Sequence, residues 1–196
     1  MTRTVTCELD LPGWLVALLD GEERVFADET RAMEFAVELA TINIEQSTGG
    51  PFAALVLNQA NGKLVTAGVN SVTRNGLSIA HAEIVAISLA QSQMGRWDLS
   101  LDHELTLVST CEPCAMCYGA LPWSGIRRLV CGARREDAEQ AGFDEGDKPA
   151  NWVASLQRRG IEVRQDLLRS RACRLFEQYR AVGGEMYNVS REVSDE

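Results

Sequence analysis

His81-Ala-Glu83 and Pro113-Cys114-Ala-Met-Cys117 are the two short segments that restrict the fold and the chemistry of this chain most strongly. On a helix, residues three positions apart lie on one face, so Cys114 and Cys117 can bind one metal ion together. This spacing alone does not distinguish a metal site from a redox-active cysteine pair. The imidazole of His81 supplies a third ligand, and two thiolates with one imidazole are a typical zinc-binding set.

The three predicted ligands leave one position of a tetrahedral zinc ion open to water, which is typical of catalytic sites. Zinc lowers the pKa of bound water to about 7. Glu83 follows His81 by two residues at the start of a predicted helix, so its carboxylate can reach that water. Helix capping is the alternative role, but it is disfavoured because residues 84–95 carry no charge. We therefore predict that Glu83 is the proton-transferring residue.

The residues around these segments predict helices and strands in alternation. Asp28 is a suitable N-cap, and Asn61-Gly62 is a strong signal for a turn between two antiparallel strands. Helices are predicted over residues 28–46, 81–94, 134–142, 149–159 and 167–181, with a short one from residue 112 onward. Strands are predicted over residues 52–57, 63–69, 104–109, 126–132 and 161–163.

A hairpin followed by strands that alternate with helices indicates an α/β fold. We predict three layers, α/β/α, in which a mixed five-stranded sheet has helices on both faces and strands three to five are parallel. A chain of 196 residues is long enough to bury one sizeable core. Residues 1–27 are predicted to form an N-terminal extension that packs on the main domain. Residues 28–196 are predicted to form that domain, with a C-terminal helix and tail.

Charge and cysteine content narrow the class of protein. The formal net charge of -9 disfavours binding to nucleic acid. Seven arginines between residues 158 and 180 can form a basic patch, although a solvated helix face is the favoured interpretation. No apolar run approaches the ~20 residues of a membrane helix, and the N-terminus lacks a secretory signal pattern. Three of the six cysteines fall within seven positions, which in a reducing compartment favours metal or redox chemistry over a disulfide framework. We expect a cytoplasmic protein without a membrane partner.

Residues 28–150 resemble the cytidine-deaminase-like superfamily, whose signature combines H-x-E with P-C-x-x-C. Within this superfamily, the chain is most similar to bacterial guanine deaminases. The segment that indicates this narrower similarity is Ala141-Gly-Phe-Asp-Glu145. Where that family usually has an aspartate after Phe-Asp, this chain has Glu145. The segments that carry the resemblance are Gly49-Gly-Pro-Phe-Ala53, Gly68-Val-Asn-Ser-Val-Thr73, His81-Ala-Glu83, Ser109-Thr-Cys-Glu-Pro-Cys-Ala-Met-Cys117 and Ala141-Gly-Phe-Asp-Glu145.

The resemblance implies roles for residues that the sequence pattern alone would assign differently. Asn70 is expected to hydrogen-bond the edge of a base, and Ala82, Phe52 and Trp123 to complete the substrate pocket. Glu145 is expected to lie over the leaving amine as a second catalytic residue. Without the resemblance, Asn70 would be a turn residue, Trp123 a core residue and Glu145 part of a solvated loop.

We predict zinc-dependent hydrolytic deamination of a free nucleobase, with guanine converted to xanthine and ammonia. A guanine-like triazine such as ammeline remains an open substrate. The alternatives are a deaminase of tRNA adenosine or of another nucleobase or nucleoside (cytosine, adenine), and a zinc module without activity. The resemblance also implies a homodimer, in which a C-terminal segment, with Tyr187 as a candidate, covers the site and can be swapped between subunits.

Overall fold

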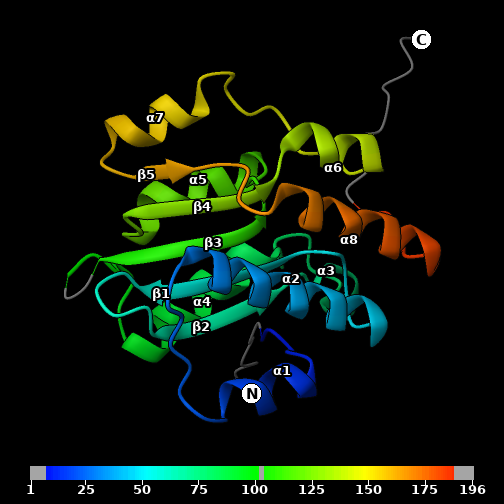
Figure 1. The fold of residues 1–196 in the computed structure, drawn as a ribbon, viewed down its shortest axis with the longest axis horizontal. Helices are drawn as coiled ribbons and strands as arrows, with labels where there is room; N and C mark the ends of the chain where they lie inside the picture. The colour runs from blue at the N-terminus through cyan, green and yellow to red at the C-terminus, as the bar shows by residue number, and fades with distance from the viewer. Residues whose placement is uncertain (1–7, 102–103, 188–196) are drawn as a thin grey trace, which may run out of the picture.

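A five-stranded mixed sheet forms the centre of the protein in the computed structural model, which describes residues 8–101 and 104–187 (Figure 1). The strands lie in the order β2-β1-β3-β4-β5. β1 pairs antiparallel with both β2 and β3, whereas β3, β4 and β5 are parallel. The predicted fold class is therefore confirmed. The strands are β1 (Ala53–Asn58), β2 (Leu64–Val69), β3 (Leu105–Cys111), β4 (Arg128–Ala133) and β5 (Glu162–Arg164).

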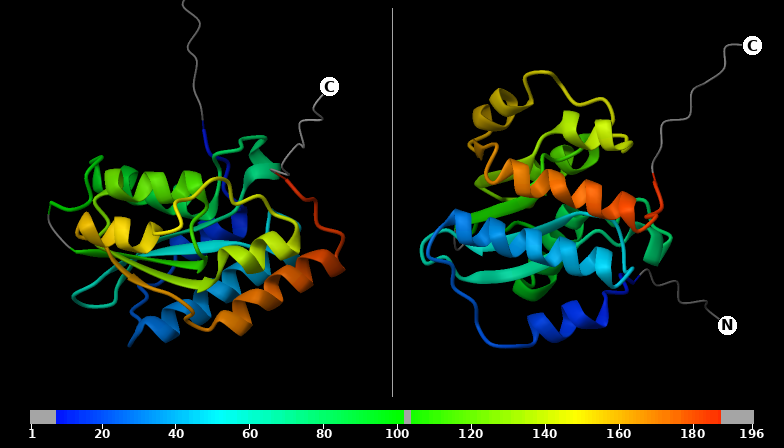
Figure 2. Two further views of the ribbon diagram at one scale, coloured as in Figure 1. Left: turned by 90° about the horizontal axis from the view of Figure 1, so that it is seen from above. Right: turned by 45° about the vertical axis from the view of Figure 1, so that its right-hand side comes forward.

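Helices cover both faces of the sheet because alternate residues of its strands are apolar toward opposite sides. Ala53, Leu55 and Leu57 of β1 belong to a core cluster with α2 and α8, while Ala54 and Val56 belong to a second cluster with α4, α5 and α7. Figure 2 shows α2 and α8 on the side of the sheet opposite α4 and α5. The helices are α1 (Gly13–Leu19), α2 (Glu29–Glu45), α3 (Val72–Asn75), α4 (Ala82–Met94), α5 (Ala115–Ser124), α6 (Arg135–Ala141), α7 (Trp152–Arg158) and α8 (Arg169–Ala181).

The predicted helix from residue 112 begins three residues late. β3 continues to Cys111, and the backbone N–H of Glu112 donates to the carbonyl of Ala133 on β4, 2.8 Å away. This pairing keeps the chain extended through Pro113, so Cys114 becomes the N-cap of α5. The N-cap position matters because it places the Cys114 thiol at the positive end of the helix dipole.

The N-terminal segment contains a helix that the sequence did not predict. Pro12 is the N-cap of α1, and Leu15 is completely buried in the core cluster that includes α2. The indole N–H of Trp14 donates to the Thr48 hydroxyl at 3.1 Å. We propose that the N-terminal extension ends at residue 27 and the main domain begins at residue 28. The predicted tail beyond Tyr187 lies outside the described residues.

Two of the arginines near the C-terminus bind acidic side chains of α2. Arg164 pairs with Glu29 at 2.6 Å, and Arg171 pairs with Glu34 at 2.7 Å. Both acids lie on α2, so these pairs connect β5 and α8 to that helix. An intramolecular role, rather than a free basic patch, accounts for these two arginines.

We expect Gly68→Ala to lower the free energy of unfolding by about 1–3 kcal/mol, the range for an overpacked core. Gly68 lies on β2, where a Cβ atom would stand 2.5 Å from the Ala82 carbonyl oxygen and 2.5 Å from the Ala86 nitrogen. These are backbone atoms of α4, so the helix would have to move away from the sheet. Urea unfolding measures the effect.

Gly119→Ala is the control, because a Cβ atom there meets nothing within 4 Å on the exposed side of α5. Alanine favours a helix, so this variant should be unchanged or up to about 1 kcal/mol more stable. Equal unfolding curves for wild type and Gly68→Ala would show that the contact between β2 and α4 is not tight.

Candidate active site

The two segments that the sequence singled out meet at one edge of the sheet. β1 is antiparallel to both β2 and β3, so β2 and β3 run in the same direction. α4 and α5 follow these strands along the chain and therefore begin at the same edge. His81 is the N-cap of α4 and Cys114 is the N-cap of α5, while Cys117 lies in the first turn of α5.

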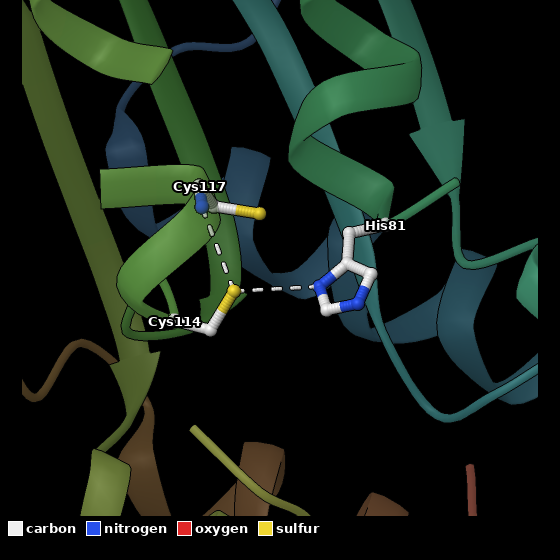
Figure 3. A group of neighbouring side chains, drawn as sticks. All are labelled: His81, Cys114 and Cys117. Carbon is white, nitrogen blue, oxygen red and sulfur yellow. Dashed lines mark hydrogen bonds between the residues drawn. The ribbon is translucent and has the colours of Figure 1, made fainter. Parts of the chain in front are cut away.

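The geometry of the three predicted ligands fits a zinc ion. The Nδ1 atom of His81 lies 3.5 Å from the Sγ atom of Cys114. One ligand atom from each of His81, Cys114 and Cys117 can be chosen so that all lie within 4.8 Å of one another. Tetrahedral zinc, with Zn–S near 2.3 Å and Zn–N near 2.0 Å, separates its nitrogen and sulfur ligands by roughly 3.5 Å. Figure 3 shows the three side chains grouped between the starts of α4 and α5.

A cavity adjoins these ligands and brings together most of the predicted site residues. Glu83 comes from the first turn of α4, and Glu145 comes from the loop that follows α6. Both carboxyl-bearing side chains are buried, with 6% of each residue exposed. The lining residues are Phe52, Asn70, His81, Glu83, Cys111, Glu112, Cys114, Phe143, Asp144, Glu145 and Tyr187.

Asn70 is fixed by the backbone around it. Its Oδ1 atom accepts hydrogen bonds from the N–H groups of Gly50 and Val72, each at 3.3 Å. The Asn43 side chain donates to its carbonyl oxygen at 2.9 Å. With Oδ1 held in this way, the side-chain NH₂ group of Asn70 is the part that can donate to a ligand in the cavity.

Aromatic rings form one wall of the cavity. Phe52 and Phe143 meet edge to face with ring centroids 4.9 Å apart, and Tyr187 lies 5.4 Å from Phe143. The Tyr187 hydroxyl is buried and has no hydrogen-bond partner among the described residues. Its ring lies over the backbone of Gly50, where any Cβ atom would collide with it.

Two residues predicted to bind substrate lie elsewhere. Trp123, which was predicted to line the ring pocket, is 79% exposed and lines a separate hollow with Trp97 rather than the cavity described above. It follows Cys117 by six positions on α5, which turns it away from the ligand-bearing face. Ala82 is completely buried, and its side chain packs in the core. Only its backbone N–H, at the open end of α4, is a group that can face a ligand.

Burial raises the pKa values of the carboxyl groups of Glu83 and Glu145. Desolvation, with a further contribution from the negative charge of Cys114, raises the pKa of Glu83 to about 7. Desolvation and the charges of Cys114 and Glu83 raise the pKa of Glu145 to about 8. The hydrogen bond from Cys117 lowers the pKa of Cys114, desolvation opposes this, and the hydrogen bond with His81 lowers the pKa further. The resulting pKa of Cys114 is about 4. The site therefore combines a metal-binding thiolate with two carboxyl groups that can exchange protons near neutral pH.

Residues 27–133 match the family described as the cytidine and deoxycytidylate deaminase zinc-binding region. The chain belongs to this family. It is a zinc-dependent aminohydrolase, as its sequence predicted. Guanine deaminase from Bacillus subtilis (strain 168) is 36% identical over 121 residues, which cover 59% of this chain and 74% of that protein.

Solved structures extend the similarity over nearly the whole deaminase. The structure of guanine deaminase from Nitrosomonas europaea is 44% identical, with a TM-score of 0.87, over 92% of this chain and 100% of that one. A structure of NE0047 in complex with 2,6-diaminopurine is 46% identical, also with a TM-score of 0.87, over 92% of this chain and 96% of that one.

Sequence reasoning missed three residues at or near the site of this deaminase. Phe143 lies inside a motif that was used for the resemblance, but its ring was not assigned to the pocket. Glu112 precedes the Pro-Cys pair, and only the tertiary fold shows that it lines the cavity. Lys148 has a side chain that is 1% exposed, although its neighbours in the sequence are polar. A lysine between Asp147 and Pro149 gave no sign of burial.

We expect Glu83→Gln to keep one zinc per chain and to lose deaminase activity. Glutamine keeps the shape of the side chain but cannot transfer a proton. A general acid–base group contributes ~10²–10⁴ in rate, and the loss should lie at the upper end because Glu83 serves more than one transfer. Elemental analysis and an ammonia-release assay measure the two quantities.

Cys114→Ala is the matched variant, because it removes a ligand and leaves Glu83 in place. It should lose both zinc and activity. Full turnover by zinc-loaded Glu83→Gln, or an unchanged zinc content in Cys114→Ala, would contradict these roles.

Proposed function

We propose that this deaminase converts guanine and water to xanthine and ammonia. The observation that carries the proposal is that Glu145 lines the same cavity as Glu83 and two of the predicted zinc ligands, His81 and Cys114. Two carboxyl groups suit a reaction in which one proton goes to a ring nitrogen and another to the leaving amine. The similarity to the Nitrosomonas europaea guanine deaminase over 92% of the chain supports the same substrate.

The roles of the residues follow from their chemistry. His81, Cys114 and Cys117 would hold a zinc ion, which when bound lowers the pKa of a coordinated water and supplies the nucleophile. Glu83 accepts a proton from the attacking water and passes it to the ring nitrogen beside the amine-bearing carbon. Glu145, in its protonated form, donates a proton to the amine as the carbon–nitrogen bond breaks. The hydroxyl proton of the same carbon then restores Glu145 as the new carbonyl forms.

The remaining cavity residues would bind and enclose the base. The side-chain NH₂ of Asn70 donates to an acceptor on the base edge, and the Phe52 and Phe143 rings pack against the planar ring system. We propose that Tyr187 covers the site and that its unpartnered hydroxyl bonds to the substrate. The backbone N–H of Ala82 is retained as a further donor.

The charge distribution supports a free base rather than a nucleic acid as substrate. The net charge is -9, and Arg164, Arg169 and Arg171 each form an ion pair with an acid of the same chain. Paired arginines have less charge to offer to a phosphate backbone. No helix among the described residues is long and apolar enough to cross a membrane.

Assembly and location belong to the same proposal. Trp97 and Trp123 are each 79% exposed and line one hollow of the surface. Exposed apolar surface of this kind is typical of protein interfaces, and we propose that a second copy of the chain covers it in a homodimer. A swapped C-terminal segment remains a prediction; Tyr187 reaches the cavity of its own chain. The free cysteines of the described residues support a cytoplasmic location.

We expect guanine to be the preferred substrate in a panel that also contains adenine, cytosine, cytidine, ammeline and a tRNA anticodon stem-loop. A site that hydrogen-bonds its substrate discriminates strongly against analogues that lack the matching groups. Ammonia release should therefore give a kcat/KM for guanine at least about 100-fold above that for adenine or cytosine. Faster turnover of the tRNA stem-loop, together with salt-sensitive binding, would contradict guanine as the substrate and favour tRNA adenosine.

We expect Glu145→Gln to lower kcat on guanine by about 100-fold or more, with a much smaller effect on KM. The amide can still bind substrate but cannot donate its proton to the amine. Asp147→Asn is the matched control, because Asp147 is an exposed carboxylate of the same loop and should change kcat little. If Glu145→Gln works at the wild-type rate while Glu83→Gln is inactive, Glu145 is an ordinary loop residue.

A further inference from the structure

We propose that Lys148 is a positioning residue for Glu145. Its ammonium group ties the loop of residues 142–148, which carries Glu145, to the segment directly before α5, which carries the ligand Cys114. The inference rests on the proposed function, because it needs Glu145 to act in the reaction.

Lys148 reaches the ligand segment from inside the protein. Its Nζ atom donates to the carbonyl oxygen of Pro113 at 2.9 Å and lies 3.4 Å from the Oε2 atom of Glu112. The same atom lies 4.3 Å from the ring centroid of Trp152, in a cation–π arrangement. Three groups therefore surround an ammonium whose side chain is 1% exposed.

A second connection lies on the other side of Cys114. The backbone N–H of Ala115 donates to the carbonyl oxygen of Glu145 at 2.9 Å. Gly146 has a positive φ of 66°, and a Cβ atom there would stand 3.1 Å from the Cβ atom of Ala115. The loop thus holds Pro113 through Lys148 and Ala115 through Glu145, with Cys114 between the two attachments. A shift of Lys148 would move Glu145 relative to the ligand.

Glu112 is itself held in place, so it provides a fixed partner for the ammonium. The Gln165 side chain donates to its Oε1 atom at 2.5 Å, and the backbone N–H of Arg135 donates to its Oε2 atom at 3.3 Å. Gln165 directly follows β5, and Arg135 is the first residue of α6, two residues after the end of β4. Lys148 is therefore anchored to the sheet rather than to another loop.

A contribution to the stability of the fold does not by itself explain why Lys148 is buried. Taking a charge out of water costs several kcal/mol, and replacing a buried ion pair by apolar residues is often neutral or stabilising. The chain has 19 basic residues, of which only Lys63 and Lys148 are lysines. The compact ammonium forms three contacts in different directions, which a planar guanidinium cannot reproduce in the same space.

Lys148→Met tests the proposal, because methionine keeps an unbranched chain and removes the ammonium. We expect one zinc per chain, a kcat lowered about 10- to 100-fold, as for other residues that orient a catalytic group, and a KM that changes little. Lys63→Met is the matched control, since Lys63 is exposed and pairs with Glu23, and it should keep the wild-type kcat. The assay uses whichever base the wild type deaminates fastest, so a failure with guanine would refute the proposed function without affecting this comparison.

The coupling to Glu145 separates positioning from a structural role. In a Glu145→Gln background, Lys148→Met should lower the residual kcat little further, because both changes disable the same group. Equal losses in both backgrounds, or a lower melting temperature with a wild-type kcat, would overturn the proposal. If Lys148→Met does not fold, Lys148→Arg replaces it. The larger head group should then lower kcat about tenfold with zinc retained, and a wild-type kcat would overturn the proposal.

Discussion

The contact between the beginnings of α4 and α5 is the constraint on which the site depends. His81, Cys114 and Cys117 are 33 or more residues apart across the two helices, yet their donor atoms converge on one point. The convergence requires both helices to start at the same sheet edge and α4 to lie directly on β2. Gly68 permits that approach because it has no side chain between the strand and the helix. The geometry of the ligands therefore depends on how the sheet positions the starts of α4 and α5.

Buried acidity is the second organising feature. Glu83, Glu112 and Glu145 are all buried around one small cavity. Desolvation and the negative charge of Cys114 raise the pKa values of Glu83 and Glu145, and the charge of Glu83 raises that of Glu145 further. The donor set supplies a place for zinc, and Lys148 supplies a fixed positive charge at Glu112. This balance explains how two carboxyl groups in one cavity can exchange protons near neutral pH.

The C-terminal part of the chain contributes Tyr187 to the lining of the cavity. Arginines of β5 and α8 pair with acids of α2 and α6, which holds α8 against the sheet. After α8, the Tyr179 hydroxyl donates to the Glu185 carbonyl at 2.7 Å, which directs the chain back toward the site. Tyr187 then reaches the aromatic wall beside Phe143. The ion pairs of the arginine-rich segment thus fix α8, from which the chain continues to Tyr187, although the composition of the segment alone also suggested a basic surface.

The sequence by itself determined the chemistry and the order of the five strands along the chain. Ligand spacing on a helix is local, so Cys114 and Cys117 together with His81 indicated a metal site, while the turn at Asn61-Gly62 and the alternating elements predicted the mixed sheet. The start of α5 and the burial of Lys148 were decided only by the tertiary structure. Each depends on partners distant in the chain, such as the Ala133 carbonyl that keeps Glu112 extended. A local pattern carries no information about such partners, because burial and hydrogen bonding between distant segments exist only once the sheet has assembled.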